Sequence, residues 1–129
     1  MSEMLFIIFC IVIIIFYLSY RFYGGKILKR LFSIDDKNPT PSHTINDNVD
    51  YVPTNPLILF GHHFSSIVGA GPIVGPVIVG IVFGWLPALL WIIIGSVFIG
   101  GPHDMGAIIS SIRHQGRSIS EIANRYISP

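Results

Sequence analysis

The sequence predicts an all-α membrane protein with about three transmembrane helices, the second interrupted by glycine and proline. Hydrophobic residues make up 51% of the chain and charged residues only 12%, whereas soluble domains carry about 25% charged residues. Two long apolar stretches, Met4–Tyr20 and 57–102, contain no Asp, Glu, Lys or Arg. The chain of 129 residues has room for about three spans of ~20 residues. Because three spans rarely enclose a substrate path, we expect a fragment, a truncated copy or one part of a larger assembly.

Residues 1–20 are predicted to form the first transmembrane helix. Its apolar run, Met4–Tyr20, is rich in Ile and Phe and would be about 26 Å long as a helix. The alternative is a signal peptide, which needs a positive start and a small-residue cleavage site. Glu3 precedes the run and aromatic residues follow it, so we favour an uncleaved span. The single cysteine, Cys10, cannot form an internal disulfide.

Residues 21–56 are predicted to be a basic flank followed by an irregular loop. Four basic residues follow the first span: Arg21, Lys26, Lys29 and Arg30. The positive-inside rule then predicts that this segment is cytoplasmic and that the N-terminus is outside; such a flank can also hold anionic lipid. Residues 33–56 contain four prolines, four asparagines and four aspartates. The aspartates lack the spacing of a calcium loop, and we expect a solvated linker.

Residues 57–129 are predicted to form a segment with two further spans and a short C-terminal helix. We place the spans at about Leu57–Phe83 and Trp85–Ser111, with the turn at Gly84, because Gly breaks a helix and Trp favours the membrane interface. Arginines after the last span agree with the topology, since an even number of spans between two basic segments leaves both in the cytoplasm.

The tail carries a helix-start signal. Ser118 and Glu121 have the spacing of a capping box, in which the serine side chain accepts from the backbone three residues on. Apolar residues after it share one helical face: Ile119, Ile122, Ala123, Tyr126 and Ile127. A helix on the membrane surface fits this pattern, and so does the lead-in to a further span.

The most informative stretch is Phe60–Pro76, FGHHFSSIVGAGPIVGP. Glycine and proline interrupt the helical hydrogen bonds, and in lipid each freed backbone group must be satisfied by protein or by a water-filled cavity. Transporters line substrate paths with such unwound segments, and we expect one near 69–76; close helix packing through small residues is the alternative. The candidate path residues here are His62, His63, Ser65, Ser66, Gly69, Gly71, Pro72, Gly75 and Pro76. The two histidines could titrate near neutral pH or simply bond carbonyls near the interface.

Two further groups of polar residues lie in or beside the third span. His103 and Asp104 are candidates for a proton relay, because an intramembrane carboxylate beside an imidazole is expensive and usually functional. In the alternative, Asp104 lies among the headgroups or pairs with an arginine such as Arg113. Arg113 and Arg117 are either topology signals or ligands of a substrate carboxylate.

No signature of an enzyme is present in the sequence. Neighbouring histidines on a helix point about 100° apart, so His62 and His63 do not suggest one metal site, and we expect no metal, no cofactor and no catalytic residue. The formal net charge of +1 suggests no nucleic-acid partner. The expected partner is the lipid bilayer.

Several motifs together resemble the N-terminal region of the carbon starvation protein A family, from about residue 50 to the C-terminus. They are Asp50–Asn55, Phe60–Pro76, Gly84–Pro87, Leu90-Trp91, His103-Asp104 and Ser111–Ser118.

The resemblance implies an inner-membrane carrier of small peptides or pyruvate, coupled to protons or another cation and made during nutrient limitation. The family is similar to the amino acid–polyamine–organocation superfamily, whose inverted repeats use a broken first core helix. The Gly-Pro stretch would be that helix. Family proteins are several times longer, which implies further spans or a partner subunit. The alternative is a truncated, non-transporting membrane protein that packs against a partner carrier or is inert.

Overall fold

The computed structural model describes residues 2–127, which are all-helical apart from turns and loops. Residues 1, 128 and 129 lie outside the described part, and the ends of the predicted segments 1–20 and 57–129 fall there. Two compact units are distinguished: Met1–Asp36 with Ile93–Pro129, and Lys37–Ile92. We describe each unit by itself.

The first helix, Ser2–Leu31, is long and apolar enough to cross a membrane. It consists of α1 (Ser2–Leu18), a π-helical stretch (Ser19–Leu28) and α2 (Lys29–Leu31). The helix is thus longer than the sequence indicated, because the hydrophobic run ends at Tyr20 whereas the helical backbone does not. The basic residues of the predicted flank lie on the last turns of this helix.

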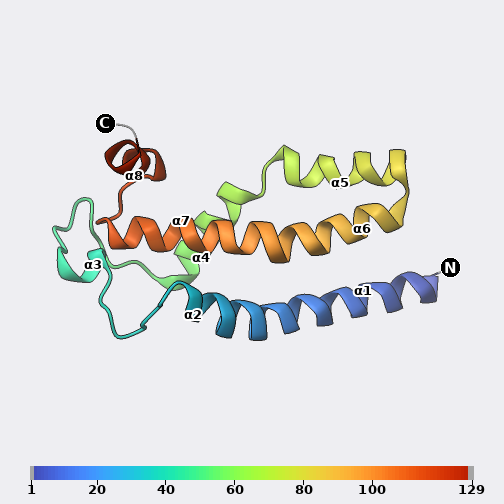
Figure 1. Ribbon diagram of the computed structural model, residues 1–129, viewed down its shortest axis with the longest axis horizontal. Coiled ribbons are helices and arrows are strands. Elements are labelled where there is room, and N and C mark those ends of the chain that lie inside the picture. Colours follow the sequence, from blue (N-terminus) through green and yellow to red (C-terminus); the bar gives the residue numbers. More distant parts are fainter. Residues whose placement is uncertain (1, 128–129) are drawn as a thin grey trace. The chain divides into compact units, whose positions relative to one another are not determined.

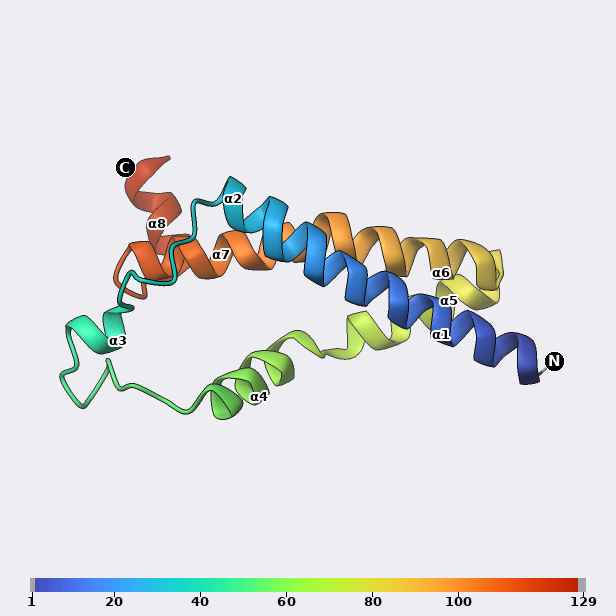
Figure 2. The ribbon, with the colours of Figure 1, turned by 90° about the horizontal axis from the view of Figure 1, so that it is seen from below.

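The third helix, Trp85–Arg113, is also long and apolar enough to cross a membrane. It consists of α6 (Trp85–Ile94), a second π-helical stretch (Gly95–Gly100) and α7 (Gly101–Arg113). In the first unit, the later part of the first helix runs beside α7 and in the same direction (Figures 1 and 2). This parallel arrangement agrees with the predicted even number of spans between the two basic segments.

A small set of contacts holds these two helices together. The rings of Tyr23 and Phe98 lie 5.3 Å apart between centroids, and the side chains of Leu28 and Val97 are buried. The Phe32 ring lies so close to Gly106 that a Cβ added there would be 3.4 Å from its Cζ atom. Aromatic contacts with defined geometry add about 0.5–1.5 kcal/mol beyond the buried area, so these pairs set the register of the two helices.

The predicted second span is a bent pair of helices, α4 (Pro56–Ile67) and α5 (Ala70–Phe83), which meet at 51° and together have the length and hydropathy of a broken span or a re-entrant loop. Asn55 caps α4, its side-chain oxygen accepting from the N–H of Leu57 at 2.9 Å. The predicted turn at Gly84 is confirmed: α5 ends at Phe83, and Gly84 has φ +90°, a conformation that glycine adopts without strain. The chain then folds back so that a Cβ on Gly80 would lie 3.9 Å from Cβ of Ala88.

The loop before α4 contains one short helix, α3 (Pro41–Thr44), and a tight turn at Asp47. Its Oδ1 accepts from the N–H groups of Tyr51, Asp50 and Val49 at 2.8, 2.9 and 3.0 Å. The bonds from Tyr51 and Val49 contribute most to a pKa of Asp47 below its ordinary value, because they stabilise the ionised carboxylate. Asp47 therefore serves as a backbone anchor.

The C-terminal helix α8 spans Ile119–Tyr126, and the predicted cap is confirmed. The N–H of Glu121 donates to Oγ of Ser118 at 3.2 Å. The rings of His114 and Tyr126 meet edge to face with centroids 5.4 Å apart, which places α8 against the end of α7.

Most large apolar side chains of both units are exposed. Among the described hydrophobic residues only Leu28, Ala88 and Val97 are buried. A surface of this kind in water would aggregate, and it marks a membrane or protein contact. The structure is therefore that of an all-α membrane protein.

Candidate functional site

The break between α4 and α5 is confined to Val68 and Gly69 (Figure 1). This corrects the expectation of an unwound stretch over 69–76, since α5 is helical from Ala70. The interruption by Gly and Pro is confirmed, but it is shorter than predicted.

Pro72 explains the position of the break. In a continuous helix the N–H of residue 72 would donate to the carbonyl of Val68, but proline has no N–H and its ring clashes with that carbonyl. Pro72 therefore lies in the first turn of α5, where a missing N–H costs little. Pro76 lies inside α5, and the helix continues through it at the cost of one hydrogen bond.

The break leaves polar backbone groups at two helix ends. The first turn of α5 has no acceptor within the helix for the N–H groups of Ala70 and Gly71, and the last turn of α4 leaves the carbonyls of Ser65 and Ser66 without a helical donor. A helix N-terminus attracts anions and a helix C-terminus attracts cations. A partial positive charge and a partial negative charge therefore lie within a few residues of each other in an otherwise apolar segment.

The two serines before the break are engaged with their own helix. The Oγ atoms of Ser65 and Ser66 each donate to the carbonyl of His62 at 2.9 Å. Serine hydroxyls bonded back to the preceding turn often bend a helix, so this pair supports the break from the N-terminal side. Their hydroxyl oxygens keep lone pairs that can accept from a ligand.

The remaining candidates of this segment are exposed in the second unit. The side chains of His62 and His63 are exposed. No described heavy atom beyond the local backbone lies within 4 Å of a Cβ added at Gly69, Gly71 or Gly75. The close-packing alternative is therefore not realised by the described residues of this chain, and the surface around the break stays open.

His103 and Asp104 form a side-chain pair on α7. The Nδ1 atom of His103 lies 3.0 Å from Oδ1 of Asp104, with side-chain exposures of 78% and 43%. The next residues on α7 show where the pair lies along the first helix. Met105 lines a cavity together with Lys29 and Asp36, and Gly106 contacts Phe32. The pair is thus at the level of the basic end of the first helix.

Arg113 has a role that the sequence reasoning missed. Its Nη2 donates to the carbonyl oxygens of Phe32 and Ser33, at 2.5 and 3.2 Å. These carbonyls lie just past the end of α2, where a helix leaves acceptors unsatisfied and where a cation is favourable. Arg113 therefore ties the end of α7 to the end of the first helix. Arg117 instead pairs with Glu121 one turn on, at 2.7 Å.

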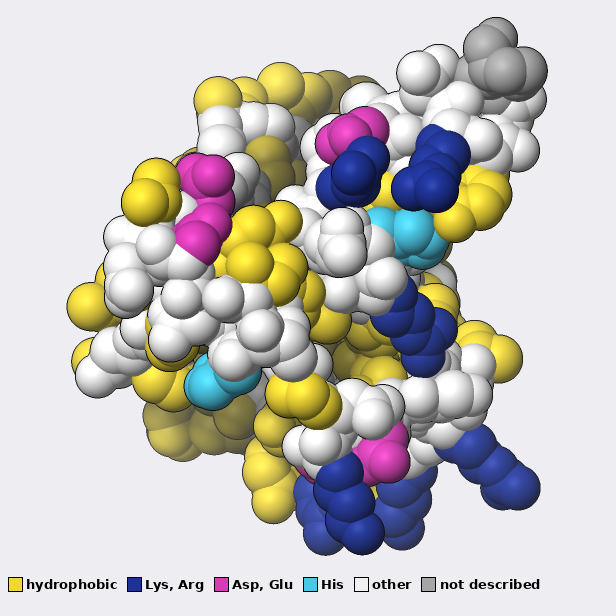
Figure 3. Space-filling view, turned by 90° about the vertical axis from the view of Figure 1, so that its left-hand side faces the viewer, with side chains coloured by type: hydrophobic (Ala, Val, Ile, Leu, Met, Phe, Trp, Pro, Cys, Tyr) yellow, Lys and Arg dark blue, Asp and Glu magenta, His cyan; other side chains and the backbone are white. Residues whose placement is uncertain are grey.

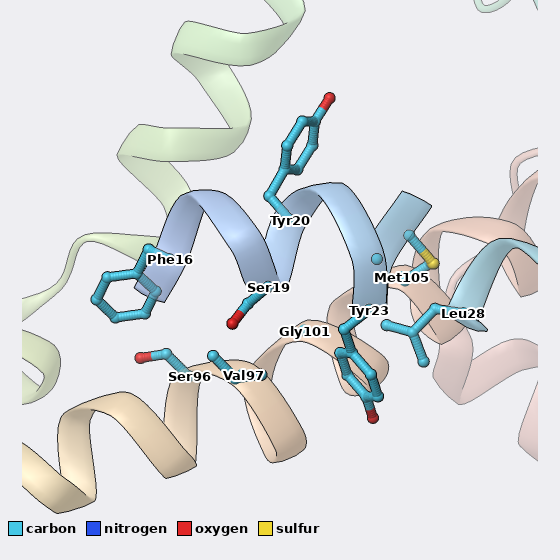
Figure 4. Close-up of a pocket in the computed structure, with 10 residues that line it drawn as sticks. Phe16, Ser19, Tyr20, Tyr23, Leu28, Ser96, Val97, Gly101 and Met105 are labelled. Atoms are coloured by element: carbon cyan, nitrogen blue, oxygen red, sulfur yellow. The ribbon is translucent and has the colours of Figure 1, made fainter. Parts of the chain in front are cut away.

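The sequence reasoning also missed a cavity of about 260 Å³ between the first helix and the third (Figure 4). Phe16, Ser19 and Tyr23 line it from one side, and Ser96 and Val97 from the other. Each side is π-helical over part of its length, and such segments are frequent at functional sites.

One signal for this feature was present in the sequence. The motif Phe-x-Gly-Gly occurs within the first π-helical stretch as Phe22–Gly25, and at the end of the second as Phe98–Gly101, whose last glycine begins α7. In each, a Cβ on the second glycine would lie 3.4 Å from the carbonyl oxygen five residues earlier. Glycine removes the side chain that would crowd this wide turn.

The described residues contain no group of three or more His, Cys, Asp or Glu side chains placed to hold a metal ion. The groups available for binding are helix ends, hydroxyls, two exposed imidazoles and one imidazole–carboxylate pair.

Known proteins with similar sequences are transporters by name. The chain is 44% identical over 112 residues to the "Peptide transporter CstA" of Bacillus subtilis, covering 87% of this chain and 19% of that protein. It is 42% identical over 115 residues to the protein of the same name in Escherichia coli, covering 89% and 16%. The "Pyruvate/proton symporter BtsT" of Escherichia coli is 38% identical over 115 residues, with the same coverage of 89% and 16%.

The chain thus spans less than a fifth of the length of these curated relatives. No solved structure matches it. Residues 3–129 match the family described as "Carbon starvation protein CstA", which includes the broken pair α4–α5, the His103–Asp104 pair and both π-helical stretches. The chain belongs to the carbon starvation protein CstA family.

Proposed function

We propose that this chain is the N-terminal part of an inner-membrane secondary transporter for small peptides or pyruvate, coupled to protons or another cation and serving the response to starvation. The observation that carries the proposal is the broken pair α4–α5 inside the family-matched region. Relatives named as peptide transporters and as a pyruvate/proton symporter support the substrate classes. A transporting role makes catalysis unnecessary, and we propose none.

The chemistry of the break suits these substrates. The N–H groups of Ala70 and Gly71 can donate to a carboxylate, which both a peptide and pyruvate carry, as half-helix N-termini do in other transporters. The carbonyls of Ser65 and Ser66 can accept from a peptide ammonium or hold a coupling cation. One site would thus bind the two ends of a zwitterion, or a carboxylate with its cation.

Uptake into membrane vesicles from the native host tests the proposal. Vesicles with the protein should accumulate labelled dialanine or pyruvate at least about tenfold above vesicles from a deletion strain, a difference equivalent to about 1.4 kcal/mol. A protonophore should abolish the accumulation if protons drive it. Equal uptake of both substrates with and without the protein would show that it does not transport them.

We further propose that the open surface around the break is covered by other transporter spans or by a partner subunit, within the lipid bilayer. Backbone groups freed at Val68 and Gly69 are costly when exposed to lipid. Gly71 and Gly75 have room for such a neighbour, because nothing described lies within 4 Å of their Cβ positions.

The proposed topology has the N-terminus outside and both residues 21–56 and the C-terminus in the cytoplasm. It rests on the basic ends of two parallel helices. In a Cys10→Ser background, single cysteines at Ser42 and Ser120 should react with a membrane-impermeant maleimide only after the cells are opened. Reaction of either position in intact cells would reverse the topology.

A further inference from the structure

A second cavity, of about 510 Å³, lies next to the one in Figure 4. The two share Tyr20, Gly24 and Met105 in their linings. Together they form what we call the interhelical groove, which lies along the first helix where it meets α7. All of its lining residues belong to the first unit.

The groove changes character along its length. The first cavity, shown in Figure 4, is mostly apolar, with Phe16, Leu28 and Val97 among its walls. The second cavity contains the charged side chains, namely Arg21, Lys29 and Asp36. A groove that is apolar at one end and charged at the other matches a ligand with the same division, apolar at one end and charged at the other.

The charge at the mouth is positive by one unit. The Lys29 side chain is paired with Asp36. The Arg21 side chain is exposed and has no hydrogen bond or ion pair among the described residues. Lys and Arg side chains gather on this end of the first unit (Figure 3). One net positive charge is the complement of one phosphodiester, and Arg is suited to bind its oxygens in bidentate geometry.

The depth of Arg21 fits the same ligand. The apolar part of the first helix, Met4–Tyr20, is about 26 Å long at 1.5 Å per residue, which is close to the hydrocarbon thickness of about 30 Å. Arg21 follows directly and so falls at the boundary where lipid phosphates lie. Basic pockets between helices on the cytoplasmic side are known to hold anionic headgroups.

Glycine keeps the groove open. Gly24 lines both cavities, and a Cβ added there would meet nothing closer than the Ser19 carbonyl oxygen at 3.9 Å. A larger side chain at this position would therefore project into the groove without disturbing the first helix. Ser19 and Ser96 supply hydroxyls to the first cavity, and Figure 4 shows them on opposite walls.

We propose that the interhelical groove binds an anionic phospholipid, with its phosphate at Arg21 and Lys29 and one acyl chain along the cavity between the π-helical stretches. The lipid would bridge the first and third helices where few side chains are buried. This site is separate from the break between α4 and α5 and does not depend on the transport proposal.

Native mass spectrometry of the purified protein in detergent, titrated with phosphatidylglycerol or phosphatidylcholine, tests the site. Phosphatidylglycerol should bind at least about fivefold more tightly, since one basic residue near a phosphate contributes about 1 kcal/mol. Arg21→Gln should remove this preference. Gly24→Leu should weaken binding of both lipids by filling the groove.

Arg30→Gln is the matched control, because Arg30 lies on the same helix end but outside both cavities. This substitution should change the affinity for phosphatidylglycerol by less than about twofold, because an exposed charge outside the groove acts on the lipid only through screened, long-range attraction. An equal loss in Arg30→Gln and Arg21→Gln would reduce the effect to general charge attraction and overturn the site.

Two soluble competitors separate a lipid from a free anion. Glycerophosphoglycerol and inorganic phosphate carry the headgroup charge without acyl chains, and neither should displace phosphatidylglycerol at equal concentration. Displacement by either one would show a simple anion site. Equal affinity for phosphatidylcholine would likewise contradict the proposed role of Arg21.

Discussion

Replacing both Pro72 and Gly69 by alanine should join α4 and α5 into one continuous helix and abolish transport. In a continuous helix, removing the interior proline is worth about 3 kcal/mol and replacing the glycine about 1 kcal/mol. A shift of about 4 kcal/mol changes the ratio of straight to broken helix by about a thousandfold. The free N–H groups at Ala70 and Gly71 would then be consumed by the helix, and substrate uptake should fall by more than about tenfold.

Pro76→Ala is the matched control for this variant. Pro76 lies inside α5, so alanine there restores one hydrogen bond while Pro72 still interrupts the helix at Val68. Uptake in vesicles gives the functional result, and amide exchange at Val68–Gly71 reports whether the break persists. If the double variant has slow exchange at these amides but normal uptake, the break does not carry the substrate site.

Asp104→Asn should abolish accumulation driven by a proton gradient while leaving membrane insertion intact. The substitution preserves the shape of the side chain but removes the charge that faces Nδ1 of His103 at 3.0 Å. Proton coupling needs a group that changes charge during the cycle, and a histidine–carboxylate pair is suited to this near neutral pH. Accumulation should fall by at least about tenfold, whereas exchange of labelled for unlabelled substrate should continue.

Other substitutions locate the coupling group. Glu121→Gln removes a carboxylate of the same unit that is paired with Arg117, and it should leave accumulation unchanged. His62→Gln and His63→Gln should differ from each other, because the two rings point about 100° apart on α4. Normal accumulation by Asp104→Asn and both histidine variants, from about pH 5.5 to about pH 8 where histidine changes charge, would place coupling outside these residues.

The position of Asp104 along α7 indicates where its proton exchange would take place. The neighbouring Met105 and Gly106 lie beside Lys29 and Phe32, near the ends of both helices. A carboxylate near the helix ends would exchange protons close to a membrane surface rather than at the centre of the bilayer. The role of the pair as an intramembrane proton relay stays a prediction.

Local signals in the sequence predicted the elements well. The turn at Gly84 and the cap at Ser118 were both confirmed, because each depends on the backbone within one turn of the residue concerned. The bend in the second span was predicted from its Gly and Pro content, but its extent was overestimated. Proline disrupts the hydrogen bond to the residue four positions earlier, so the break appears before Pro72 and spares the helix around Pro76.

The sequence by itself determined the membrane class, the apolar spans, the interruption of the second span and the family. These follow from the length of hydrophobic runs and from short motifs, which need no knowledge of neighbours in space. Only the tertiary structure decided that the first helix continues to Leu31, that Arg113 bonds the carbonyls of Phe32 and Ser33, and that two π-helical stretches enclose a cavity. The Arg113 bonds join residues about 80 positions apart, and the cavity is lined by residues of both the first and the third helix. Such pairings leave no periodic pattern in the chain, and only the repeated Phe-x-Gly-Gly motif pointed to the π-helical stretches.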